Sequence, residues 1–231
     1  MRIAIIGDFH GRSKLAAFRH FLREAKPDVV LQVGDCQYYE DMEVPFYFIH
    51  GNHEHWSTID SLREGKYERR NLHYLSDAEI VTIGGLQIVG IGGIPRGDSR
   101  KDSPKFFDLA AYERLSKMGG VDVVLSHDTP IHFSNGERSR TSEELRTLCE
   151  VMAPRFWFSG HHHYWDTEKL GETTIISLDK WPHGWAVLDI DEERRVSWQR
   201  WSPIDREMYD AKLPAWRAGE QALKKSINRE G

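Results

Sequence analysis

The sequence Ile3-Ala4-Ile5-Ile6-Gly7-Asp8-Phe9-His10-Gly11 joins a short apolar run to a turn bounded by glycines. A β-branched run that ends at glycine and precedes a helical pattern predicts a first strand followed by a strand-to-helix loop. Asp8 and His10 are therefore expected at the carboxyl end of a strand, the edge at which open α/β sheets bind ligands. Their spacing can turn a carboxylate oxygen and an imidazole nitrogen toward one cation. Taken alone, however, an Asp in a turn is more often an Asx turn than a metal ligand.

Composition limits the class of protein. The 231 residues suffice for one large α/β domain, with two small domains as the less favoured alternative. Lys and Arg number 31 against 36 Asp and Glu, a formal charge of −5, so a polyanionic substrate would have to be held by local groups. Cys36 and Cys149 are the only cysteines, which favours buried free thiols in a reducing compartment.

The apolar run near Met1 has only four residues before Gly7, which is too short for the core of a signal peptide. No later apolar run approaches the length needed to span a membrane. We therefore expect a soluble, cytoplasmic protein.

Four further apolar runs end in Asp, Asn or His. They are Val29–Val33 before Gly34-Asp35, Val44–Ile49 before His50-Gly51-Asn52-His53-Glu54, Val121–Leu125 before Ser126-His127, and Phe156–Phe158 before Gly160-His161-His162-His163. Helical spacing from Leu15 to Ala25 separates the first two strands, so a right-handed parallel crossover should bring Asp35 to the same edge as Asp8.

A second sheet is predicted to begin at the hairpin formed by Glu79–Ile83 and Leu86–Ile91 around Gly84-Gly85. Its remaining strands are expected at Thr174–Ser177, Trp185–Ile190 and Val196–Trp201. Helices are predicted around Leu109–Met118 and from the capping box at Thr141–Glu144 to about Met152. We assign residues 1–202 to one domain and 203–231 to a C-terminal extension, in which a helix could form.

The strand ends together supply seven candidate metal ligands of mixed chemistry: Asp8, His10, Asp35, Asn52, His127, His161 and His163. Imidazole, carboxylate and amide groups in one set suit Mn²⁺, Fe²⁺ or Zn²⁺ better than Mg²⁺ or Ca²⁺. Seven ligands exceed the needs of one tetrahedral ion, so we predict two ions that share a carboxylate. Asp35, at the end of a central strand, is the expected bridge.

These motifs resemble those of the calcineurin-like metallophosphoesterase superfamily: Asp-x-His, Gly-Asp, Gly-Asn-His-Glu, Ser-His and Gly-His-x-His, in that order. The resemblance implies an α/β fold of two packed mixed sheets flanked by helices, a four-layer α/β/β/α sandwich. It also implies that Asp8, His10, Asp35 and His163 hold one ion and that Asp35, Asn52, His127 and His161 hold the other. His53 matches the histidine that acts on the leaving group.

Within this superfamily the chain is more similar to intron-lariat debranching enzymes. The similar runs are Gly34–Gln37, Phe48–Glu54, Asn71–Leu75, Gly90–Ile94 and Leu125–Asp128. Position 8 is Asp where many debranching enzymes have cysteine, and the stretch after Ile94 is shorter than their lariat-recognition insert. The resemblance therefore implies phosphodiester chemistry and does not extend to lariat RNA.

The residues themselves agree with this chemistry. Two ions roughly 3.5–4 Å apart can bind a bridging hydroxide as nucleophile, and His53, next to Asn52, can protonate a departing alkoxide. Arg96, Arg100 and Arg138 are candidates for binding a substrate phosphate. Arg12 is the only Arg or Lys within two positions of a predicted ligand or His53, and this scarcity of cations favours a diester over a monoester.

Two alternatives remain open. One is a phosphomonoesterase, including a protein phosphatase, and the other is a non-catalytic scaffold on the same fold that binds a protein partner. A scaffold would be expected to lose ligands, and every motif here is complete. The substrate is expected to be a phosphate ester, with nucleotides and nucleic acids as candidates. The sequence does not indicate an oligomeric state.

Overall fold

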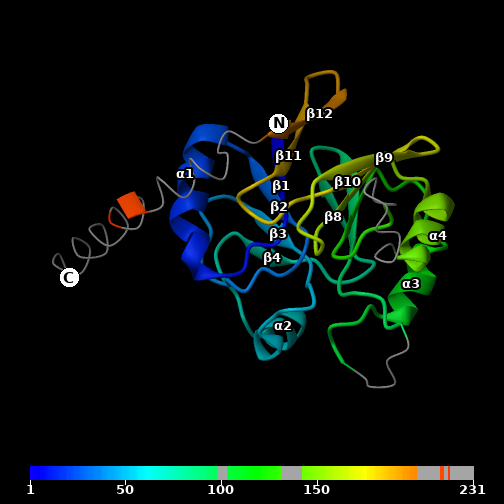
Figure 1. Ribbon diagram of the computed structural model, residues 1–231, viewed down its shortest axis with the longest axis horizontal. Coiled ribbons are helices and arrows are strands. Elements are labelled where there is room, and N and C mark those ends of the chain that lie inside the picture. The colour runs from blue at the N-terminus through cyan, green and yellow to red at the C-terminus, as the bar shows by residue number, and fades with distance from the viewer. Residues whose placement is uncertain (98–102, 132–141, 202–213, 216–217, 219–231) are drawn as a thin grey trace.

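The computed structural model describes residues 1–97, 103–131 and 142–201, together with residues 214, 215 and 218. Two six-stranded sheets stack against each other, with strand orders β12-β11-β1-β2-β3-β4 and β5-β6-β7-β8-β10-β9. In Figure 1, α1 lies on the outer side of the first sheet, and α3 and α4 lie on the outer side of the second. The predicted four-layer α/β/β/α arrangement is confirmed.

The first sheet is built around β1 (Arg2–Ile6), which pairs in parallel with β2 (Val29–Gln32) and antiparallel with β11 (Trp185–Ile190). The outer strands are β3 (Phe46–Phe48), β4 (Leu72–Tyr74) and β12 (Val196–Trp201). The parallel pairing of β1, β2 and β3 directs their carboxyl ends to one edge, as the sequence predicts.

The second sheet contains β5 (Ile80–Ile83), β6 (Leu86–Ile91), β7 (Val123–Ser126), β8 (Phe156–Ser159), β9 (Asp166–Leu170) and β10 (Thr173–Ser177). Its parallel strands β6, β7 and β8 run side by side, and the carboxyl ends of β7 and β8 carry the predicted ligands His127, His161 and His163. The predicted hairpin at Gly84-Gly85 joins β5 and β6 and is confirmed.

The assignment of Trp185–Ile190 and Val196–Trp201 to the second sheet is wrong. Both strands return to the first sheet, where β11 pairs with β1 and β12 pairs with β11. The physical reason is that β11 is buried on both faces, so its residue pattern fits a central position in either sheet. The pattern of buried residues alone therefore does not predict which of the two sheets β11 joins. The sequence analysis also missed β4 and β9, which are short and largely polar.

The helices are η1 (Arg12–Lys14), α1 (Leu15–Ala25), α2 (Trp56–Arg63), α3 (Leu109–Leu115) and α4 (Glu143–Met152). Ser142 begins α4 by accepting a hydrogen bond from the amide of Leu145 at 3.2 Å, an N-cap that the sequence anticipates. A left-handed residue, Lys26, ends α1 just before Pro27.

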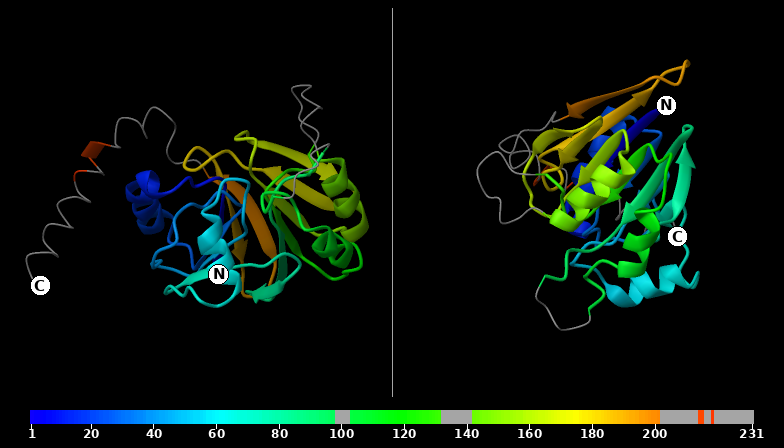
Figure 2. Two further views of the ribbon diagram at one scale, coloured as in Figure 1. Left: turned by 90° about the horizontal axis from the view of Figure 1, so that it is seen from below. Right: turned by 90° about the vertical axis from the view of Figure 1, so that its right-hand side faces the viewer.

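The core has three layers because residues alternate along the central strands. Ile3 and Ile5 of β1 point into the apolar layer between the two sheets, whereas Ala4 and Ile6 pack beneath α1. A third layer lies between the second sheet and the helices α3 and α4. Figure 2 shows this stack from two further sides. Rigid packing on both faces of each sheet fixes the strand ends that carry the candidate site.

Cys36 and Cys149 are both buried and free, as expected. Among the described residues, no helix combines the length and apolar character that a membrane span requires. The predicted extension 203–231 lies outside the described residues apart from 214, 215 and 218.

Candidate metal centre

The loops that follow β1 and β2 are held together by Gln32, a buried polar residue at the end of an apolar strand. Its side-chain amide donates to the carbonyls of Gly7 and Gly34, and its oxygen accepts from the amide of Gly34 at 3.1 Å. One side chain thus fixes the turns that carry Asp8 and Asp35 relative to each other. This role is not predicted from the sequence, although a glutamine inside the apolar run Val29–Val33 indicates a buried polar group that needs partners.

Glu54 performs a similar task for the loop after β3. Its buried carboxylate accepts hydrogen bonds from the amides of Cys36, Gln37 and Gly51 at 3.0, 3.2 and 3.1 Å, and from the hydroxyl of Tyr39. It therefore joins the segment after Asp35 to the turn before Asn52. Among the described residues, these bonds go to backbone amides and a tyrosine hydroxyl and not to a predicted ligand histidine.

Two glycines allow the loops to approach closely. Gly34 has a φ of +97°, and a Cβ at this position would collide with the ring of His127. A Cβ on Gly51 would collide with the carboxylate of Asp35. A side chain at either position would therefore push a predicted ligand out of place.

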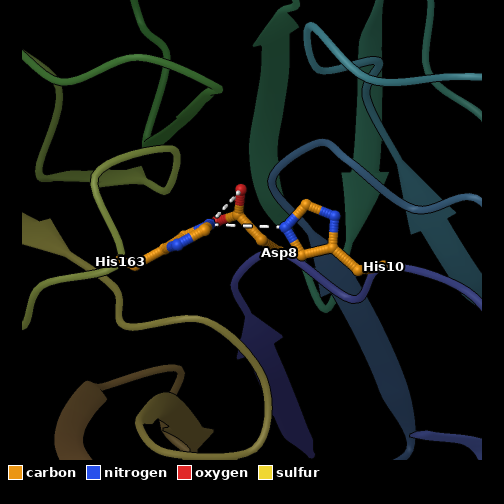
Figure 3. A group of neighbouring side chains, drawn as sticks. All are labelled: Asp8, His10 and His163. Carbon is orange, nitrogen blue, oxygen red and sulfur yellow. Dashed lines mark hydrogen bonds and ion pairs between the residues drawn. The ribbon is translucent and has the colours of Figure 1, made fainter. Parts of the chain in front are cut away.

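One group of candidate ligands joins the two sheets at Asp8, His10 and His163 (Figure 3). The Nε2 atoms of His10 and His163 face each other at 3.3 Å, and Nε2 of His163 lies 3.4 Å from Oδ1 of Asp8. Donors bound at about 2.0–2.1 Å around one tetrahedral ion lie about 3.3–3.4 Å apart, so these spacings fit a shared cation.

A second group contains Asp8, Asp35 and His127, all buried. His127 lies 3.5 Å from Asp35 through Nε2, and the same nitrogen is 2.8 Å from Oδ1 of Asn52. Nδ1 of His127 is 2.9 Å from the carbonyl of Val33, which orients the ring and leaves Nε2 toward the centre. Asp8 is the carboxylate common to both groups, whereas the sequence identifies Asp35 as the bridge, and that assignment stays a prediction.

His161 lies beside the second group without belonging to it. Its ring is 5.0 Å from that of His127, and its backbone amide donates to Oδ2 of Asp8 at 3.0 Å. It also shares a third group with Asp128 and His162, in which Nε2 of His162 is 2.6 Å from Oδ1 of Asp128. Burial, assisted by the charge of His127, lowers the pKa of His161 to about 4, so the ring is neutral at pH 7 and has a lone pair for a metal.

The environment of Asp8 also fits a cation. Burial by itself raises the pKa of a carboxyl, but the interaction with His163 and the charges of His127 and His10 outweigh it and lower the pKa of Asp8. Oδ1 of Asp8 is buried and has no hydrogen-bond partner among the described residues. A buried ionised oxygen without a hydrogen bond costs free energy, and a bound cation would remove that cost.

Four predicted ligands adopt a left-handed backbone, which is uncommon for residues other than glycine. They are His10, Asp35, His161 and His163, with φ values of 51°, 57°, 67° and 53°. The described residues include ten such non-glycine positions, so the unfavourable conformations are concentrated in these loops. The folded core holds the side chains in a geometry that the loops alone would not prefer.

Comparison with known proteins assigns the family. A family model described as calcineurin-like phosphoesterase matches residues 1–165, which include every motif of the candidate centre. The chain belongs to this family. The resemblance drawn from the sequence is confirmed, and with it the expectation of a phosphoesterase with candidate His and Asp metal sites.

Similar proteins include several named lariat debranching enzymes. That of Entamoeba histolytica is 29% identical over 200 residues, covering 71% of this chain and 56% of the enzyme. That of Schizosaccharomyces pombe is 25% identical over 206 residues, covering 71% of this chain and 43% of the enzyme. An uncharacterized protein of Haemophilus influenzae is 27% identical over 201 residues, covering 70% of this chain and 83% of that protein. The chain spans about half the length of the debranching enzymes that it matches.

Solved structures confirm the fold. A protein of Thermus thermophilus superposes with a TM-score of 0.61 at 13% identity, covering 86% of this chain and 97% of that one. GAP50, described as the anchor in the inner membrane complex of Plasmodium, gives 0.56 at 12% identity and covers 94% of each chain. At these identities the likeness concerns the phosphoesterase fold alone.

The predicted catalytic and substrate-binding residues of this phosphoesterase do not all lie beside the candidate metal centre. His53 is exposed, and its backbone amide donates to Oδ1 of Asp35 at 2.8 Å, so the residue stays next to the centre while its ring is open to solvent. Arg96 is exposed on the loop after β6, with its guanidinium 5.6 Å from the ring of Phe106. Arg100 and Arg138 lie outside the described residues.

Lys14 is a cation near the centre that the sequence analysis missed. Its Nζ donates to the carbonyl of Trp181 at 2.5 Å, and burial together with the charge of Lys180 lowers its pKa to about 8. Asp8 acts on the same pKa in the opposite direction, so Lys14 lies within electrostatic reach of the carboxylate. The sequence motifs do not indicate that Lys14 is near Asp8, because the two residues are six positions apart along the chain.

Proposed function

We propose that this phosphoesterase is a metal-dependent phosphodiesterase with a dinuclear centre formed by Asp8, His10, Asp35, Asn52, His127, His161 and His163. The observation that carries the proposal is that two groups of candidate ligands share Asp8, whose buried Oδ1 has no hydrogen-bond partner among the described residues. Relatives named as debranching enzymes support a diester as the substrate class.

The donor set favours transition metals. Four imidazoles, two carboxylates and one amide suit Mn²⁺, Fe²⁺ or Zn²⁺, and a neutral His161 matches the ligand form of the ring. When bound, two such ions supply Lewis-acid stabilisation of phosphoryl charge and a nucleophile at neutral pH. Because Cys36 and Cys149 are free thiols, we place this activity in the cytoplasm.

Residues of the chain perform the other tasks. His53 donates a ring proton to the departing oxygen, and the bond from its amide to Asp35 holds it beside the reacting phosphate. Gln32 and Glu54 keep the ligand loops aligned through contacts with their backbones. An exposed imidazole can exchange its proton with solvent after each turnover, which suits an acid catalyst.

The experiment is elemental analysis of protein purified without chelator, followed by assays with bis-p-nitrophenyl phosphate and p-nitrophenyl phosphate. We expect two transition ions per chain, a higher kcat/KM for the diester, and loss of activity in EDTA that the metal restores. Full activity in excess EDTA would overturn the metal-dependent mechanism. A metal-loaded protein that hydrolyses neither substrate would favour a non-catalytic scaffold.

Phosphomonoesterase activity is the second candidate because of Lys14. A monoester dianion requires more positive charge than a diester, and Lys14 supplies a cation within electrostatic reach of Asp8. If the monoester is the better substrate and Lys14→Met removes that preference, this second candidate replaces the first.

A further inference from the structure

A pocket of about 420 Å³ opens at the carboxyl ends of β3, β4 and β6, on the same edge as the candidate metal centre. Its lining combines cationic, acidic and aromatic side chains, which include His50, Arg63, Asp77, Arg96, Phe106 and Arg114. Of this set, only Arg96 is predicted from the sequence as a binding residue. Arg63 and Arg114 come from α2 and α3, and folding brings them to the same cavity.

Three guanidinium groups give the pocket its chemistry. Arg63 donates from Nε and Nη2 to the hydroxyl of Tyr74 at 3.3 and 3.1 Å, and Arg114 donates from Nη2 to the backbone carbonyl of Asp77 at 3.3 Å. A guanidinium has five N–H donors, so these contacts orient both groups and leave further donors for a ligand. Planar donors of this kind bind phosphate oxygens in pairs.

The two carboxylates of the pocket have backbone partners. Asp77 accepts from the amide of Gly92 at 2.8 Å, and Asp108 caps α3 by accepting from the amide of Ala110 at 2.9 Å. Among the described residues, the pocket lining holds three guanidiniums and two carboxylates that are already hydrogen-bonded, and Arg63 also pairs with Asp60 of α2 at 3.6 Å. The imbalance favours an anionic ligand over a cation.

His50 connects this pocket to the metal centre. It lines the pocket, lies 2.9 Å from the hydroxyl of Tyr74 through Nδ1, and precedes Asn52 by two residues. Its carbonyl accepts from the amide of Gly93 at 3.0 Å, which fixes the loop after β6 against the loop after β3. A ligand that fills the pocket would therefore contact the loop that carries the predicted metal ligand Asn52.

We propose that this pocket binds a second phosphate group of the substrate, next to the phosphate that is hydrolysed, through Arg63, Arg96 and Arg114. The inference rests on the proposed function, because it specifies the substrate class of the same site. Two sources share this chemistry: a nucleotide with two separate phosphates, and an oligonucleotide in which a neighbouring linkage supplies the second. A volume of about 420 Å³ accommodates a phosphate with its sugar.

The first test measures binding to the metal-loaded full chain by calorimetry, with adenosine 3′,5′-bisphosphate and adenosine 5′-monophosphate as probes. We expect the bisphosphate to bind at least about tenfold more tightly, and Arg63→Gln, Arg96→Gln and Arg114→Gln each to remove most of that difference. Arg23→Gln, on the exposed face of α1, is the matched control and should retain it. Equal binding of the two probes, or arginine variants that behave like the control, would overturn the pocket assignment.

The second test compares hydrolysis of a dinucleotide with and without a 5′-phosphate, and of a trinucleotide. A preference for the 5′-phosphorylated dinucleotide that falls about tenfold in the arginine variants would support the nucleotide source. A preference for the trinucleotide alone would support the oligonucleotide source.

If no diester is hydrolysed but bisphosphate binding still depends on the three arginines, the proposed function fails and the phosphate pocket remains. If diesters are hydrolysed without dependence on these arginines, the pocket proposal fails.

Discussion

Asp8, which is fully buried, and Asp77, whose side chain is 9% exposed, both follow strands of the first sheet, yet their surroundings differ. His10, His127 and His163 surround Asp8, and their influence lowers its pKa despite complete burial. Burial is the main influence on Asp77 and raises its pKa to about 6, although the amide of Gly92 and the charge of Arg63 lower it in part.

This difference shows how one edge of the fold can bind both cations and anions. Imidazoles from the second sheet keep Asp8 ionised, which prepares that region for cations. Around Asp77, guanidiniums from α2 and α3 prepare the neighbouring region for an anion. Charged groups of opposite sign are thus placed side by side, which is what a phosphate ester bound to metal ions requires.

The largest expected effect is that of Asp8→Asn. Because Asp8 belongs to both ligand groups, we expect less than one metal ion per chain and no detectable turnover, measured by elemental analysis and diester hydrolysis. The same measurements on Asp35→Asn test the assignment of Asp35 as the bridge, which requires loss of both ions. Asp77→Asn should keep both ions, and retention of two ions in Asp8→Asn would contradict the shared role of Asp8.

Removal of the proposed acid should affect chemistry without affecting metal content. We expect His53→Ala to keep both ions while kcat falls about 10²–10⁴-fold, because its exposed ring belongs to none of the three groups of candidate ligands among the described residues. The loss should be larger for diesters with alkyl leaving groups than for p-nitrophenyl esters, which depart without protonation. His161→Ala is the matched comparison and should lose metal. If His53→Ala emptied a site instead, the two roles would have to be exchanged.

Glu54 tests whether alignment of the loops matters as much as the ligands. Glu54→Ala leaves the amides of Cys36, Gln37 and Gly51 without their acceptor, so we expect about 3 kcal/mol of lost stability and a 10–100-fold fall in activity. Urea unfolding and diester hydrolysis measure the two effects. Glu43→Ala, which removes only an exposed ion pair with Arg19, should change neither. Equal behaviour of the two variants would show that Glu54 is not a positioning residue.

The smallest expected effect concerns Asp77 and pH. Its folded pKa of about 6 exceeds the ordinary value of 3.8, so the fold favours the protonated form. The stability that the protonated carboxyl contributes to the fold is fully present below pH 4 and is lost as pH rises through 6. Asp77→Asn should therefore be more stable than wild type by about 1–3 kcal/mol at pH 8 and equal to it at pH 4, in urea unfolding of metal-free protein. A difference that does not change with pH would contradict a raised pKa.

Much of the site could be predicted because its information is local. Each predicted ligand lies close behind an apolar run, and parallel pairing brings those runs to one edge whatever the details of packing. The residues that support the ligands were harder to find. Gln32 and Glu54 act through backbone groups that are near only in the folded chain, and no short motif describes such contacts.

The errors and omissions have the same physical origin. The sheet that receives β11 depends on pairing with β1 across more than 180 residues, and a pattern of buried residues fits either sheet. Lys14 donates to the carbonyl of Trp181, which is distant along the chain, and Arg63 and Arg114 line the same pocket only because α2 and α3 lie at the same edge. Contacts between segments that are distant along the chain determine where β11, Lys14, Arg63 and Arg114 lie, and residue spacing in the sequence does not reveal such contacts.

The central position of β1 has a consequence for synthesis of the chain. Of the two sheets' strands β1 is made first, but its antiparallel partner β11 ends at Ile190, so one side of β1 lacks its hydrogen bonds until that strand has been made. An unpaired apolar strand invites association with other chains. Nascent chains that stop before residue 185 should therefore associate or bind chaperones more readily than chains that extend past residue 201.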